Sequence, residues 1–225
     1  MSFSDFISEQ KNTHMTHIED KVIYGGVNGT RQAILALRSL RDMLKGEKDG
    51  SISLKWDGAP AIFAGYDPRD GAFFVAKKGI FNKTPKVYKT PADVDADTSG
   101  DLALKLKQAL QYLPKLGIKG VIQGDFLFGP GDLKTEKIKG ETYVTFHPNT
   151  LVYAVPAKSP GAKAIKQAKI GIVWHTTYKG NSFETMRASY GVDVSKFKPS
   201  RDVWSQDATL RDLTKATMSK RIRRK

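Results

Sequence analysis

The chain has 225 residues, of which 40% are hydrophobic and 10% aromatic, enough for one large domain with a real core. It contains no cysteine, which excludes disulfides and thiolate metal sites, and no apolar run or signal-peptide pattern that predicts membrane insertion. A formal net charge of +14 favours a polyanionic partner such as nucleic acid, although such a charge can also serve solubility alone.

The first predicted element is an amphipathic helix that follows a glycine-rich segment, residues 25–29. Asn28 or Thr30 can cap its start, and Gly46 follows its last turn. Its apolar side chains recur at helical spacing, at Ile34, Leu37, Leu40 and Leu44.

Three short strands are expected in residues 51–78. The first alternates apolar and polar residues over Ile52–Trp56 and ends at the turn-forming pair Asp57-Gly58. The second and third, residues 61–66 and 72–77, flank the hairpin turn Asp67–Gly71. This arrangement places Lys55 at the end of a strand beside a turn that carries an aspartate, a position that presents an amine to a ligand.

The second half of the chain predicts further helices and strands after an exposed lysine-rich loop, residues 82–91, and a solvated acidic turn, residues 93–97. The predicted helices cover residues 101–113, 160–168 and 182–189. The predicted strands cover residues 120–128, 142–146, 151–155 and 170–177, the second and third forming a hairpin. After Val192 the pattern fades, and residues 200–225 form a basic tail.

The basic residues are unevenly distributed. No acid interrupts the window that contains Lys77, Lys78, Lys83, Lys86 and Lys89. No Asp or Glu occurs between Glu141 and Glu184, and the last eleven residues carry six basic side chains. These windows favour contact with nucleic-acid phosphates, for which Lys83, Lys86 and Lys89 are the first candidates.

Three fragments occur in an order that resembles the adenylation domain of ATP-dependent RNA and DNA ligases. Lys55-Trp-Asp-Gly58 is similar to the Lys-x-Asp-Gly signature, and Gly124-Asp-Phe-Leu-Phe-Gly-Pro-Gly131 resembles the glycine-carboxylate strand of RNA ligases. Leu151-Val-Tyr-Ala-Val155 looks like a later aromatic strand, and Lys77-Lys78-Gly79 sits where these families place a basic element. The stretch from His17 to about residue 187 also resembles uncharacterised proteins of large tailed bacteriophages.

The ligase resemblance implies a fold, an activity and a set of roles. The fold is α+β, with antiparallel β-sheets and flanking helices in an adenylation-like domain over residues 1–199. Lys55 is the nucleophile that takes AMP from ATP and passes it to a nucleic-acid 5′-phosphate, with RNA slightly favoured over DNA. Asp57, Gly58, Lys77, Lys78, Asp125 and Tyr153 bind the nucleotide, and Asp125 also binds Mg²⁺. The expected location is the cytoplasm, or the host cytoplasm for a viral protein; the sequence predicts no oligomeric state.

Nucleotidyl transfer requires Lys55 to be unprotonated. A reference pKa near 10.4 leaves well under about 1% of a lysine neutral at pH 7. Burial beside Trp56 and Phe63 and nearby cations would favour the neutral amine, so we expect a sheltered Lys55.

Several departures from the ligase pattern keep a second interpretation open. Pro60 replaces a usual basic residue, Asp125 replaces a glutamate, and Ile170 occupies the position of a later glutamate. The final Lys-x-Lys motif has only Lys196-Phe-Lys198 as a candidate. The alternative is a non-catalytic nucleic-acid-binding phage protein with a degenerate nucleotidyltransferase fold, in which Lys55 is an edge-strand lysine and Tyr153 a core residue.

Overall fold

The computed structural model describes residues 17–45 and 54–209. The chain divides into two compact units, one made of Met1–Leu54 with Thr209–Lys225 and the other of Lys55–Ala208. Residues 52 and 53 of the first predicted strand, Gly46 and most of the basic tail lie outside the described residues. Residues 54–56 do not form a strand, so that part of the prediction is wrong.

The first unit contains a pair of helices, α2 (Ile18–Tyr24) and α3 (Gly26–Leu44). The two helices pack closely at Gly29, which has no side chain. Any side chain at this position would collide with the carbonyl oxygen of Lys21. The amphipathic helix was expected, but it begins before the predicted caps: Gly25 holds the N-cap position, and Thr30 lies inside the helix with its hydroxyl on the Gly26 carbonyl.

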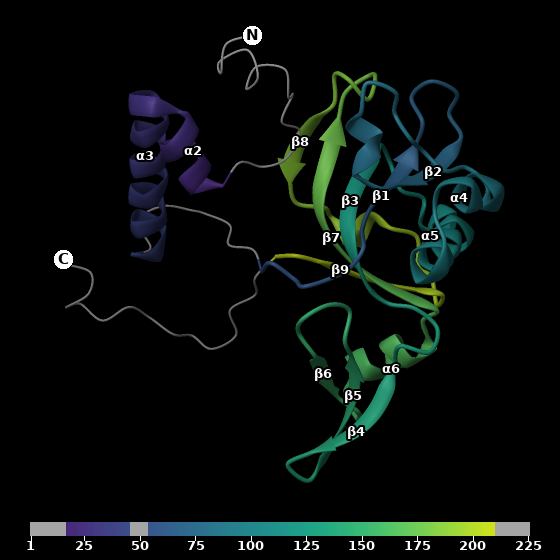
Figure 1. The fold of residues 1–225 in the computed structure, drawn as a ribbon. Helices are drawn as coiled ribbons and strands as arrows, with labels where there is room; N and C mark the ends of the chain where they lie inside the picture. Colours follow the sequence, from purple (N-terminus) through teal and green to yellow (C-terminus); the bar gives the residue numbers. More distant parts are fainter. Residues whose placement is uncertain (1–16, 46–53, 210–225) are drawn as a thin grey trace. The chain divides into compact units, whose positions relative to one another are not determined.

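The second unit is built on a six-stranded sheet in the order β2-β1-β3-β7-β8, with β9 also paired to β7 (Figure 1). Five strands are antiparallel to their neighbours, and β9 runs parallel to β7. The strands are β1 (Ala61–Tyr66), β2 (Phe73–Ala76), β3 (Val121–Phe128), β7 (Ile170–Lys179), β8 (Arg187–Tyr190) and β9 (Val203–Asp207). The predicted turn at Asp67–Gly71 joins β1 to β2 and is closed by a hydrogen bond between the Gly71 amide and the Asp67 carbonyl.

Helices α4 (Pro91–Asp97) and α5 (Gly100–Tyr112) cover one face of this sheet (Figure 1). The short helix η2 (Leu113–Leu116) follows at Pro114, which ends α5 as expected. The core of this face includes fully buried Ile62, Leu106, Phe126 and Trp174. Helix α4 replaces the predicted acidic turn, because Thr90 and Asp93 form a capping box and Pro91 suits the first helical position.

The opposite face of the sheet carries two separate hydrophobic clusters. The first gathers Phe63, Phe74 and Tyr178 with the short helix η1 (Lys78–Phe81). The second includes Phe128 and Phe146 and joins the large sheet to a three-stranded antiparallel sheet and to α6 (Pro160–Gln167). The small sheet has the order β4 (Lys134–Ile138), β5 (Glu141–Phe146), β6 (Tyr153–Pro156).

The α+β class with antiparallel sheets and flanking helices is confirmed, with two corrections to its elements. The helix predicted for residues 182–189 is wrong: one turn closes at Ser182, and β8 then pairs with the edge of β7. The first part of the predicted tail is also structured. The short helix η3 (Val194–Lys196) precedes it, and residues 203–207 form β9 inside the large sheet.

Candidate active site

The Lys55 loop, residues 55–60, leads into β1 and is anchored by its tryptophan. The ring of Trp56 stacks on Tyr153 with 5.1 Å between centroids and packs edge-on against Trp204 at 6.4 Å. Lys55 itself is exposed, so its predicted shelter beside Trp56 and Phe63 is wrong. The physical reason is that the two aromatic residues belong to different hydrophobic clusters, so they do not enclose the amine together.

Asp57 is held by the connection between β5 and β6. Its carboxylate accepts hydrogen bonds from the Asn149 side-chain amide at 2.8 Å and from the backbone amides of Thr150 and Leu151 at 2.6 and 2.8 Å. The hydrogen bond from Asn149, followed by that from Leu151, lowers the pKa of Asp57 below its ordinary value. The carboxylate therefore fixes the loop to the small sheet.

Gly58 brings the loop directly onto β3. A Cβ at this position would lie 2.5 Å from the Cβ of Asp125 and 2.9 Å from the carbonyl oxygen of Phe126. The Ala59 amide donates to the Phe126 carbonyl at 2.8 Å, and the Phe126 amide donates to the Pro60 carbonyl at 3.0 Å. The structure thus brings the Lys-x-Asp-Gly segment and Asp125 together, although Gly58 and Asp125 are 67 positions apart in the sequence.

Asp125 is half-buried on β3 and faces His175 of β7, with 3.7 Å between its Oδ2 and the histidine Nε2. The β3–β7 ladder shifts register here, because Gln123 pairs with Thr176 and Gly124 with Trp174, so His175 is an extra residue in β7. Bulges of this kind re-aim a side chain, and they recur next to active sites. Sequence reasoning assigns no role to His175, because His147 and His175 are too sparse to define a catalytic triad and a bulge leaves no local signal in the sequence.

Tyr153, the predicted purine platform, makes its contacts within the protein. Its ring stacks on Trp56 and also on Phe146, with 5.2 Å between the latter centroids. Its hydroxyl accepts a hydrogen bond from the Asp57 amide at 2.7 Å. Tyr153 therefore supports the Lys55 loop from the small sheet.

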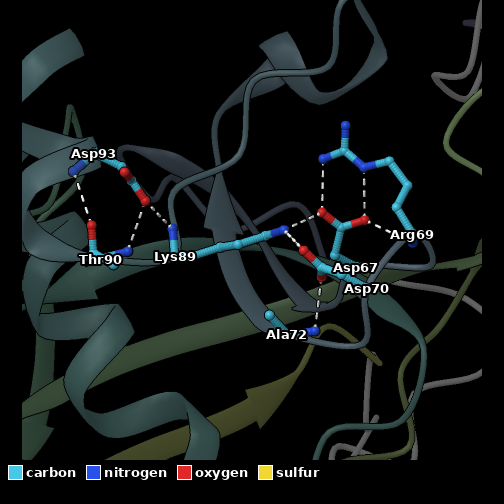
Figure 2. A network of polar contacts seen from close by, with 7 residues as sticks. All are labelled: Asp67, Arg69, Asp70, Ala72, Lys89, Thr90 and Asp93. Carbon is cyan, nitrogen blue, oxygen red and sulfur yellow. Dashed lines mark hydrogen bonds and ion pairs between the residues drawn. The ribbon is translucent and has the colours of Figure 1, made fainter.

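The predicted basic residues are drawn into ion pairs on the α4 side of the molecule. Lys77 and Lys86 both pair with Asp97, at 3.0 and 2.8 Å. Lys89 reaches Asp67 and Asp70 in the turn between β1 and β2 (Figure 2). Lys78 and Lys83 are exposed and have no ion pair within the described part of the chain. The lysine window has no acidic residue in the sequence, but the fold places aspartates from other segments beside three of its lysines.

Two further motif candidates lie away from the Lys55 loop. Ile170 is completely buried in the core, and its backbone pairs with Val203 of β9. Lys196 lines a cavity of about 450 Å³ together with Ile122 and Phe197. Side chains alternate along β3, so Ile122 and Asp125 face opposite sides of the sheet, and Lys196 lies on the side away from Asp125.

The acidic donors can be tested against Mg²⁺, the ion that the ligase resemblance implies. Residues 17–45 and 54–209 contain no group of three or more His, Asp or Glu side chains arranged to hold a metal ion. Mg²⁺ usually takes one or two carboxylates and completes its shell with water and substrate phosphates. Asp125 fits that limited role as a single carboxylate.

Comparison with known proteins identifies a family for the chain and finds no similar curated protein or solved structure. In the described residues, no helix combines the length and the apolar character that crossing a membrane requires. A family model, described as a family of unknown function (DUF6267), matches residues 12–225, and the chain belongs to that family.

Proposed function

We propose that the protein is an ATP-dependent nucleotidyltransferase of the ligase type, with Lys55 as the nucleophile. The observation that carries the proposal is the contact between Gly58 and Asp125, which joins the Lys-x-Asp-Gly segment to the glycine-carboxylate strand. Trp56 and Asp57 fix the same loop from the small sheet, so three successive residues after Lys55 are each held by a different partner. Such fixation aligns a nucleophile with its target before reaction.

In the first step, the neutral Lys55 amine attacks the α-phosphorus of ATP. A nitrogen–phosphorus bond forms while the bond to the oxygen bridging to the β-phosphate breaks, and pyrophosphate leaves with that electron pair. The amine loses its proton to water. Because Lys55 is exposed in the free protein, the bound nucleotide has to cover the amine and remove it from solvent.

In the second step, an oxygen of a nucleic-acid 5′-phosphate attacks the same phosphorus. The new phosphorus–oxygen bond replaces the bond to Lys55, whose amine regains a proton, and the strand end carries AMP ready for joining. Asp125 would hold Mg²⁺, and the ion would supply positive charge to stabilise the negative charge that develops on the phosphates. Gly58 leaves room beside Asp125, where any side chain would collide with it.

The proposal is tested by incubating the full chain with α-labelled ATP and Mg²⁺ and separating it under denaturing conditions. We expect covalent label on the wild type, none with γ-labelled ATP, and none on Lys55→Ala or Lys55→Arg. Lys179→Ala, which removes another exposed lysine, should label like the wild type. Label on Lys55→Ala, or none on the wild type with any divalent metal, would overturn the proposal.

A second candidate function is nucleic-acid binding without catalysis, and Ile170 favours it. This residue occupies the position of a ligase glutamate, is completely buried and pairs with β9, so a carboxylate there would be desolvated in the core. The labelling experiment separates the two candidates: a wild type that binds nucleic acid and never takes label is the binder.

A further inference from the structure

Most lysines around the large sheet are already neutralised by acids. Within residues 17–45 and 54–209, seven of them form ion pairs with aspartates, and these are Lys77, Lys86, Lys89, Lys105, Lys107, Lys115 and Lys196. A phosphate that approaches such a lysine has to displace a carboxylate first. These side chains therefore add little to the attraction of a polyanion.

Helix α6 and its flanks differ from this pattern. Lys158, Lys163, Lys166 and Lys169 are all exposed, and none has an ion pair within the part of the chain that the structure describes. The acid-free window between Glu141 and Glu184 contains all four. The lysines of the neighbouring β4–β5 hairpin, by contrast, share it with Glu136 and Glu141.

The packing of α6 directs its lysines outward. Ala162, Ile165 and Ala168 are buried in the cluster between the two sheets, so Lys163 and Lys166, three residues apart, lie on the exposed side of the helix. The Lys169 amide donates to the Asp202 carbonyl, which brings exposed Arg201 next to this helix end. The Asp202 carboxylate is paired with Lys115. We call these residues the α6 lysine surface: Lys158, Lys163, Lys166, Lys169 and Arg201.

We propose that the α6 lysine surface, and not the lysine-rich loop of residues 82–91, binds the phosphate backbone of a nucleic acid. Unpaired lysines release counterions when they meet phosphates, which drives this kind of binding. The inner side of α6 packs in the same cluster as Trp56, so the surface and the Lys55 loop share one rigid support. That the bound strand is the acceptor of AMP rests on the proposed function; the binding itself does not.

A membrane surface fits these residues less well than nucleic acid does. Helices that lie on membranes insert large apolar side chains below a basic face. The exposed positions of α6 carry lysine, glycine, alanine, proline and glutamine, and its one large apolar residue, Ile165, is buried in the protein core. The chemistry of the surface therefore matches a hydrophilic polyanion.

The test compares two double variants of the full chain that lose the same charge. Lys163→Gln/Lys166→Gln removes two unpaired lysines from α6, and Lys86→Gln/Lys107→Gln removes two lysines that pair with aspartates of α4. Binding of a fluorescent 5′-phosphorylated single strand and of a duplex is measured by anisotropy over a range of salt concentrations. For the α6 variant we expect the slope of log K against log salt to fall by about 1.8 on the duplex and about 1.4 on the single strand.

The control variant should keep a slope close to that of the wild type. An equal loss in both variants, or a wild type that binds neither probe in a salt-dependent way, would overturn the α6 assignment. The labelling of Lys55 is measured on the same variants without nucleic acid. Because the α6 variant should still take label from ATP, failure of the binding surface and failure of the proposed chemistry give different results.

Discussion

Gly58 is the residue at which the Lys55 loop touches β3, and its lack of a side chain is a steric requirement. Alanine would place a Cβ 2.5 Å from the Asp125 Cβ and 2.9 Å from a backbone oxygen, so either the loop or the strand would have to move. We expect Gly58→Ala to lower the free energy of unfolding by roughly 1–3 kcal/mol, the usual cost of overpacking, as measured by urea denaturation.

Gly79→Ala is the matched control for this prediction. Its Cβ would meet the nearest atom, on the flexible Lys86 side chain, at an ordinary 3.5 Å. The two variants differ in what the new methyl group contacts, since one meets packed backbone and the other a lysine side chain. Equal stability of the two proteins would show that the loop is not pressed against Asp125.

At the scale of elements, the turn between β1 and β2 is tied to the segment before α4 by buried charge (Figure 2). The side chain of Asp67 is inaccessible to solvent and pairs with Arg69 at 2.7 Å and Lys89 at 2.7 Å. Lys89 is followed directly by the Thr90–Asp93 capping box of α4. One aspartate thus orders a hairpin and the start of a helix together.

This network predicts a pH dependence of stability. Hydrogen bonds from Arg69, and then from Lys89, hold the pKa of Asp67 well below its ordinary value. Its contribution is therefore complete above the unfolded-state pKa near 3.9 and is lost as the pH falls toward the folded-state pKa. We expect the free energy of unfolding to decrease from pH 5 downward, and Asp67→Asn to flatten that decrease in urea titrations at several pH values.

Asp70→Asn serves as the comparison, because Asp70 shares Lys89 but is half-exposed. Water screens an exposed pair, so this substitution should flatten the pH profile less than Asp67→Asn does. A steeper profile for Asp67→Asn than for the wild type would contradict the assignment of the network.

The elements that could be predicted from the sequence are those with local signals. The hairpin turn at Asp67–Gly71 and helix α6 with Ser159 and Pro160 at its start carry characteristic turn and cap residues. Helix α4 carried such a signal too, in Thr90-Pro91, but the alternating aspartates suggested a solvated turn. Strand β4 has five exposed residues and no apolar alternation, so only its pairing with β5 defines it.

At the scale of the whole molecule, β9 joins the large sheet late in the chain, by pairing with β7. β9 pairs with residues 170–174, and it contributes Val203 to one core cluster and Trp204 to the other. A chain that ends at residue 199, the predicted domain boundary, would lose these contacts. We expect it to unfold at lower urea concentration than a chain that ends at residue 209, or to fail to fold.

Circular dichroism during urea denaturation measures this difference. The two truncated chains lack the same distal residues, 210–225, so a loss confined to the shorter chain identifies β9 as its cause. Equal midpoints would mean that β9 is a dispensable edge of the sheet.

The candidate site could be predicted only in part, because its residues meet across long sequence separations. Lys55, Gly58 and Asp125 were found through motif resemblance, and the structure brings Gly58 and Asp125 together. The partners of Asp57 are 92 to 94 residues away in the chain, and two of them, Asn149 and Thr150, belong to no motif. The ion pairs of Lys86 and Lys89 were missed because their acids lie on other elements.

The hold of Asn149, Thr150 and Leu151 on Asp57 has a mechanical consequence. The small sheet and the residues after Lys55 are linked through a charged carboxylate with three donors, while Gly58 is fixed to the large sheet one residue later. A tilt of the small sheet would therefore strain the peptide between Asp57 and Gly58 and also disturb the contact between Trp56 and Trp204 of β9. Such a tilt would change the distance between Lys55 and Asp125.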